Sequence, residues 1–140
     1  MFLVVDINVV LSALVSRGDS SRIFKLNSEK KNFDLVAPQF ILIEAGKHLA
    51  EIAKRSTLPF RETQEDLELI TSQIRFFPEE DYKDKLSEAR EILKAHEKDV
   101  PYLALALKFN CHIFSGDKVF KQLCPDKVKN PKEILNELFA

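Results

Sequence analysis

The sequence predicts an α/β fold with three layers, in which helices cover both faces of a central, mostly parallel sheet. Short apolar runs alternate with helical patterns along the chain, and parallel strands require such crossover connections. The first run, Phe2–Val5, is apolar throughout, which is typical of a strand buried on both faces. With 140 residues, of which 45% are hydrophobic, residues 1–140 are expected to form a single domain.

The first third of the chain is expected to contain two helices between two strands. From Asn8 the spacing of the apolar residues becomes helical. Ser20 resembles the N-cap of a second helix that extends to Lys30. Asp34–Ala37 then reads as a short strand, which Pro38 closes.

The next segment is expected to be helical. Two helices, at residues 39–54 and 61–74, are separated by a break at residues 57–59. Thr63 and Asp66 fit the spacing of a capping box, with Asp in place of Glu or Gln. A helical pair therefore follows the second strand.

The second half returns to alternating strands and helices. Residues 74–77 form the third predicted strand, and the strongly charged residues 81–95 are expected to form one amphipathic helix. Asp99, followed by Pro101, has the pattern of an N-cap and first turn, and it opens an apolar helix that ends near Asn110.

The last predicted elements are short. Residues 111–114 form the fourth strand, and a turn at residues 115–117 leads into a helix that ends at Leu123. An edge strand is expected at residues 127–129 and a final helix at residues 131–139.

Composition excludes several broad classes of protein. The 21 basic and 22 acidic side chains give a formal net charge of −1, so any contact with nucleic acid must come from a local basic patch. The chain begins with neither a signal-peptide pattern nor a membrane span, which predicts a cytoplasmic protein. Cys111 and Cys124 match neither a redox pair nor a zinc site, and both are expected to be buried thiols.

Four acidic residues are placed where ordinary surface charges are not expected. Asp6 ends an apolar strand, Glu44 interrupts an apolar stretch, Asp99 precedes an apolar helix, and Asp117 follows the fourth strand. Ligands in such sheets bind beyond the carboxyl ends of the strands. Carboxylates gathered there repel one another unless a cation is present, and oxygen ligands suit Mg²⁺ or Mn²⁺. The pattern predicts metal-assisted phosphoryl hydrolysis.

Each of these acids also has a simpler interpretation. Asp99 and Asp117 also fit the pattern of helix N-caps, Asp6 fits a turn, and Glu44 fits a solvent-facing helix position. Asn8 and Ser115 are candidate supporting groups that also fit a cap and a turn. Candidate phosphate contacts, which also fit ordinary solvated side chains, are Lys118, Arg17 and Arg22.

Three stretches together resemble one known family. They are Val4-Val5-Asp6-Ile7-Asn8-Val9-Val10, Asp99-Val100-Pro101-Tyr102-Leu103-Ala104-Leu105-Ala106 and Ile113-Phe114-Ser115-Gly116-Asp117-Lys118, with the Glu44 helix between the first two. Their order resembles the PIN-domain ribonuclease family over about residues 2 to 125. The resemblance implies strand order 3-2-1-4-5 and a metal-dependent endonuclease that cuts single-stranded or structured RNA.

The resemblance also implies roles for individual residues. Asp6, Asp99 and Asp117 would hold Mg²⁺ or Mn²⁺, and Glu44 would ligate the metal directly or through water. Asn8 and Ser115 would support the site. Many small members of the family are VapC-type toxins, which are usually homodimers silenced by an antitoxin partner.

This sequence departs from the family pattern at two places, and other functions fit part of it. Ile7 replaces a polar residue that is often Thr, and Glu97-Lys98 stands where many relatives carry another Asp. A haloacid-dehalogenase-like phosphatase also places Asp after its first strand, but it needs a second Asp where this chain has Asn8. A catalytically inactive PIN-like scaffold that binds RNA or protein is the non-enzymatic alternative.

Possible interface residues cannot be separated from core residues by pattern alone. Large apolar side chains that fit either role are Phe24, Leu26, Phe60 and Phe139, and burial in the core is expected for most of them.

Overall fold

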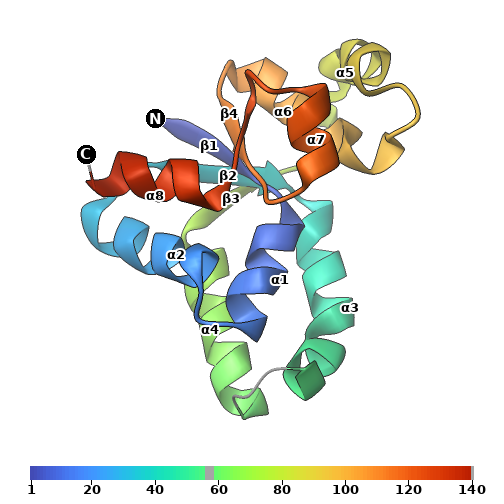
Figure 1. Ribbon diagram of the computed structural model, residues 1–140. Helices are drawn as coiled ribbons and strands as arrows, with labels where there is room; N and C mark the ends of the chain where they lie inside the picture. The colour runs from blue at the N-terminus through green and yellow to red at the C-terminus, as the bar shows by residue number, and fades with distance from the viewer. Residues whose placement is uncertain (56–58, 140) are drawn as a thin grey trace.

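The computed structural model describes residues 1–55 and 59–139 and has a five-stranded parallel sheet between helical layers (Figure 1). The strands are β1 (Phe2–Val5), β2 (Asp34–Pro38), β3 (Ile74–Phe77), β4 (His112–Phe114) and β5 (Val128–Lys129). Their order, β3-β2-β1-β4-β5, confirms the predicted order, and every neighbouring pair is parallel. The predicted break at residues 57–59 falls mostly outside the described residues.

Helices connect the strands and cover the sheet. They are α1 (Ile7–Val15), α2 (Asp19–Lys30), α3 (Phe40–Arg55), α4 (Phe60–Ser72), α5 (Leu86–Leu93), α6 (Val100–Phe109), α7 (Lys118–Leu123) and α8 (Pro131–Phe139). In Figure 1, α5 and α6 lie on one side of the sheet, and α1, α2 and α4 lie on the other. The helix α6 packs directly on β1, β2 and β4.

The core sits between α6 and the central strands. Leu3, Val4 and Val5 of β1 are at most 1% exposed, and residues 103–106 of α6 are equally buried. Phe24 of α2 meets Phe114 of β4 at a ring-centroid distance of 5.8 Å on the other side. Each such side chain contributes about 1.5–3 kcal/mol when it is removed from water. A strand that is apolar at every position is therefore explained by helices on both of its faces.

Two helices begin earlier than the sequence signals predicted. The N-cap of α2 is Gly18, and Ser20 lies buried inside the helix. In α4 the N-cap is Pro59, and the Thr63 hydroxyl donates to the Pro59 carbonyl at 3.3 Å instead of capping a helix. Both predictions were wrong because these side chains turn inward or back onto the preceding turn.

The predicted helix at residues 81–95 is also wrong in extent. Two 3₁₀ turns, Glu79–Asp81 and Lys83–Lys85, precede α5, which covers only Leu86–Leu93. Tyr82 separates the two turns with a non-helical backbone, and its side chain is only 4% exposed. Burial of this ring explains why the charged segment does not continue as one regular helix.

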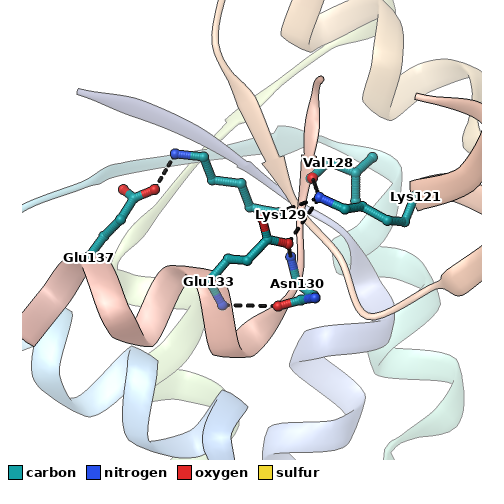
Figure 2. A network of polar contacts seen from close by, with 6 residues as sticks. All are labelled: Lys121, Val128, Lys129, Asn130, Glu133 and Glu137. Atoms are coloured by element: carbon teal, nitrogen blue, oxygen red, sulfur yellow. Dashed lines mark hydrogen bonds and ion pairs between the residues drawn. The ribbon is translucent and has the colours of Figure 1, made fainter. Parts of the chain in front are cut away.

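The last helix is attached to β5 by a polar network that the sequence analysis missed (Figure 2). Asn130 and Glu133 form a reciprocal capping box, because each backbone amide donates to the other side chain, at 3.1 and 2.9 Å. The Lys121 ammonium donates to Glu133 at 2.9 Å and to the Val128 carbonyl at 2.7 Å. Lys129 also pairs with Glu137.

The remaining expectations on burial are met in part. Cys111 and Cys124 are free thiols, but only Cys124 is fully buried. Phe24 is in the core, whereas Phe60 and Phe139 are 50% and 58% exposed. None of the helices that the structure describes is long and apolar enough to cross a membrane.

The crossover topology brings distant segments to one edge of the sheet. Asp6 follows β1 directly, and Asp117 lies three residues beyond the end of β4. The helix α6 returns from the carboxyl edge of the sheet to the start of β4, so Asp99, which precedes α6, lies at that edge as well. This arrangement places three of the four predicted site carboxylates at one edge.

Candidate active site at the carboxyl edge of the sheet

Asp6 is a buried carboxylate at the junction of β1 and α1. Its Oδ1 accepts a hydrogen bond from the Asn8 amide at 3.0 Å, and its Oδ2 accepts one from the Ser115 hydroxyl at 2.7 Å. The residue is only 1% exposed. Burial raises the pKa of Asp6 above its ordinary value, although both hydrogen bonds and Lys98 oppose this rise. Asp6 is thus both a helix cap and a group fixed at the site.

Asp117 caps the short helix α7. Its Oδ1 accepts hydrogen bonds from the amides of Val119 and Phe120 at 2.9 and 3.2 Å. Its Oδ2 lies 3.4 Å from the Lys98 ammonium. Burial raises the pKa of Asp117, but these amides and Lys98 outweigh that effect and hold the pKa below its ordinary value. Capping and a role at the site are therefore compatible, because Oδ1 caps α7 while Oδ2 faces Lys98.

Asp99 differs from the other two because its charge lacks partners. The residue is 2% exposed, and among the described residues its Oδ2 has no hydrogen-bond partner. Its side chain does not cap α6, which corrects the N-cap interpretation. Burial first, and then the negative charges of Asp6 and Asp117, raise the pKa of Asp99 to about 6. These shifts indicate that the three carboxylates lie close enough to repel one another.

Tyr102 belongs to the same site, although the sequence analysis treated it only as part of an apolar helix. Its phenolic oxygen accepts a hydrogen bond from the Ile7 amide at 3.2 Å, and its ring packs against Phe40 at 5.7 Å. Burial and the charges of Asp6, Asp99 and Glu44 raise the pKa of Tyr102. A tyrosine one turn after a site aspartate was the signal that could have revealed it.

Glu44 lies at the rim of the site. Its side chain is 41% exposed and pairs with Lys47 and His48 of the same helix, each at 3.7 Å. These partners are three and four residues away, which is the usual spacing for pairs on a helix surface. The charge of Glu44 contributes to the raised pKa of Tyr102, so Glu44 is close enough to influence Tyr102.

The predicted supporting residues differ in their placement. Ser115 is 1% exposed and connects two acids, because its hydroxyl donates to Asp6 while its oxygen accepts the Asp117 amide at 3.1 Å. Asn8 contributes its backbone amide to Asp6, and the residue itself is exposed.

The three predicted phosphate contacts lie in different places. Lys118 is exposed beside Asp117. Arg17 lines a cavity between α1, α2 and α4. The Arg22 guanidinium lies 5.7 Å from the ring centroid of Phe139. Of the three, only Lys118 directly follows a predicted site carboxylate, Asp117. The phosphate-binding roles of all three residues stay predictions.

Whether these residues fit a divalent metal can be judged from their donor atoms. Asp6, Asp99 and Asp117 offer oxygen ligands, and the unpartnered Asp99 Oδ2 is the kind of atom that a cation would satisfy. Within residues 1–55 and 59–139, however, no three acidic, histidine or cysteine side chains are close enough together to hold a metal ion as they stand. The Lys98 ammonium forms an ion pair with Asp117. The ligand types fit Mg²⁺ or Mn²⁺, and metal entry requires the side chains to adjust.

Two cavities lie along α1. One, of about 500 Å³, runs between α1 and α3 and is lined by polar groups that include Ser12, His48 and Arg55. The other, of about 340 Å³, lies between α1 and Asp117. Asn8 and Ser12 line both cavities, and of the predicted site carboxylates Asp117 lines the second.

The fold and the acidic edge together define a class of α/β protein with a carboxylate site at the carboxyl ends of its strands. The family model described as PIN domain matches residues 4–133, so this chain belongs to the PIN domain family. PIN domains are generally nucleases that use divalent metals. Comparison with curated proteins gives no match.

A solved structure has a similar fold. It is described as the crystal structure of VapBC2 from Rickettsia felis bound to a DNA fragment from their promoter. The matching chain has a TM-score of 0.69 and 16% identity, with 93% of this chain and 98% of that chain covered. At this identity the likeness supports the fold over nearly the whole of both chains.

Proposed function

We propose that this protein is a metal-dependent endoribonuclease that hydrolyses RNA phosphodiester bonds. The observation that carries the proposal is the convergence of Asp6, Asp99 and Asp117 at one edge of the sheet, where Lys98 is the one ammonium that pairs with them among the described residues. Several carboxylates held together at the expense of stability are typical of a site that binds a cation. Membership of the PIN domain family agrees with this interpretation.

Each site residue has a proposed task. Asp6, Asp99 and Asp117 hold Mg²⁺ or Mn²⁺, and Glu44 ligates from the rim, directly or through water. A divalent metal bound there would supply charge neutralisation and a more acidic water for attack on phosphorus. Ser115 keeps the Asp6 carboxylate in place through its 2.7 Å hydrogen bond.

The two cavities along α1 are the proposed path of the RNA strand. Because they share Asn8 and Ser12, a strand that follows both passes Asp117 without ending there, which favours internal cleavage. His48 and Arg55 provide donors in the first cavity. Lys118, Arg17 and Arg22 are proposed as further phosphate contacts, since a chain of net charge −1 must bind RNA through local basic groups.

We further propose that the protein is the toxin of a VapC-type toxin–antitoxin pair, acting in the cytoplasm as a homodimer. The similar chain comes from a VapBC2 complex, which makes an antitoxin the first partner to test. Co-expression with the product of an adjacent gene should relieve any growth arrest that the protein causes. A monomer at all concentrations in light scattering would contradict the homodimer.

The activity is tested with a mixed single-stranded RNA substrate incubated in EDTA, Mg²⁺ or Mn²⁺. An Asp117→Asn variant, purified identically, controls for contaminating nuclease. Cleavage that requires metal and is lost in the variant supports the proposal. Metal-independent cleavage, or equal cleavage by the variant, contradicts it.

The earlier alternatives make different predictions in this assay. The haloacid-dehalogenase-like phosphatase is set aside, because the strand order and the family are those of PIN domains. An inactive PIN-like module would bind RNA or protein without cutting RNA under any metal condition. Retention of all four acids favours the enzyme.

A further inference from the structure

Lys98 is the one basic side chain in the described part of the chain that forms an ion pair with Asp6, Asp99 or Asp117. It lies in the 3₁₀ turn Glu97–Asp99, directly before the buried Asp99. Its ammonium is 3.4 Å from Asp117 Oδ2, although 69% of its side chain is exposed. The residue therefore reaches into the acidic site from its rim.

The position of Lys98 matters because the site carries more negative than positive charge. Three carboxylates face one ammonium, and the positive charge of Lys98 lowers the pKa of Asp6, Asp99 and Asp117 alike. Of the three carboxylates, the Lys98 ammonium pairs only with Asp117 among the described residues, and there Asp99 Oδ2 has no hydrogen-bond partner. A compact divalent ion would compensate these charges more completely.

We propose that Lys98 is an internal counter-cation. Its ammonium pairs with Asp117 in the metal-free protein and moves away when a divalent cation binds. This inference rests on the proposed metal-dependent function. Its consequence is that Lys98 weakens metal binding, so a higher concentration of metal is needed to load the site.

The geometry allows this exchange. An exposed lysine pair of this kind contributes about 1 kcal/mol or less, so breaking it requires little free energy. The backbone of the turn is held separately, because the Asp99 amide donates to the His96 carbonyl at 3.3 Å and the next residue, Val100, is buried. The lysine side chain can therefore swing into solvent while Asp99 stays in place.

The test is calorimetric titration of Mn²⁺ into the parent protein and a Lys98→Met variant. Lys31→Met is the matched control, because Lys31 is also an exposed lysine but lies at the end of α2, before β2 and at the opposite edge of the sheet. We expect Lys98→Met to bind Mn²⁺ about three- to tenfold more tightly than the parent. Lys31→Met and Lys98→Arg should bind like the parent.

The outcomes separate this inference from the function on which it rests. Equal affinity of Lys98→Met and the parent, or equal tightening in Lys31→Met, overturns the role of Lys98 and leaves metal binding intact. Absence of Mn²⁺ binding in every protein overturns both proposals. The rise of the melting temperature on adding Mn²⁺ provides a second readout, and Lys98→Gln replaces Lys98→Met if the latter does not fold.

Discussion

Two groups of charged side chains in this molecule are built in opposite ways. In the network at the C-terminal end, Glu133 accepts from Lys121 and from the Asn130 amide, and Glu137 pairs with Lys129 (Figure 2). These hydrogen bonds, first that of the Asn130 amide and then that of Lys121, hold the pKa of Glu133 below its ordinary value. In the carboxylate site, burial and mutual repulsion raise the pKa of Asp6 and Asp99.

The difference distinguishes charges that stabilise the fold from charges kept for another purpose. A carboxylate whose pKa is lowered by its neighbours favours the folded state, whereas one whose pKa is raised opposes it once it is ionised. The network therefore holds α8 to β5, whereas in the carboxylate site Asp6 and Asp99 cost stability and Asp117, whose pKa is lowered, does not. Four measurements test whether these two kinds of charge differ in this way.

Asp99→Asn should separate activity from stability most clearly. The amide keeps the shape of the side chain but removes a proposed metal ligand and a buried charge, so RNA cleavage should fall by at least about 100-fold. In EDTA at pH 7 the variant should be as stable as the parent or more stable. Asp84→Asn, which changes an exposed carboxylate paired with Lys108, is the control and should keep its activity. A variant with full activity would contradict the assignment.

Ser115→Ala should weaken the site without removing a ligand. The Asp6 carboxylate loses its 2.7 Å hydrogen bond, and the Asp117 amide loses its acceptor. Groups that orient ligands typically contribute about 10- to 100-fold in metal affinity or activity. Mn²⁺ titration and RNA cleavage should both show a loss of this size. Ser28→Ala, which removes a hydroxyl bonded to Lys25 in α2, should leave both unchanged.

The pH dependence of stability should carry the signature of Asp99. Its pKa is about 6 in the folded protein against an ordinary value of 3.8, so the folded state holds the proton more tightly. The contribution of Asp99 to stability is therefore lost as pH rises from about 4 to 6. In EDTA, Asp99→Asn should match the parent near pH 4 and exceed it at pH 7 by on the order of 1 kcal/mol. Urea unfolding at both pH values measures this difference, and a constant difference would argue against a raised pKa.

Glu137→Gln should have the smallest effect. The pair with Lys129 is partly exposed, and such pairs contribute about 0.2–1 kcal/mol. The free energy of unfolding should decrease by an amount within this range, and the decrease should be larger at low salt than at high salt. RNA cleavage should stay at the parent rate. A large loss of activity would show that α8 supports the site.

The strands could be predicted from the sequence because their signals are local, whereas the order of the strands in the sheet was implied by the family resemblance. The continuous apolar run predicted β1. The aspartates that follow β1 and precede α6 indicated a site at the carboxyl edge of the sheet. Helix starts at Gly18 and Pro59 were missed, because buried side chains such as Ser20 override the usual capping preference.

The site was predictable only as a set of residues. The residue types and their order indicated Asp6, Asp99 and Asp117 as candidates, but the spacing of residues in a sequence does not determine where their side chains point. The pairing of Lys98 with Asp117 and the hydrogen bond of Tyr102 to Ile7 depend on packing between segments distant in sequence.

The central claim is that the carboxylate site is incomplete without a divalent cation, and thermal unfolding with and without Mn²⁺ tests it directly. The measurement requires no knowledge of the RNA target. At a Mn²⁺ concentration about 100 times its Kd, the parent should gain about 2.7 kcal/mol, and Asp99→Asn should gain much less. A parent protein whose stability does not respond to Mn²⁺, or a variant that gains as much as the parent, would contradict the claim.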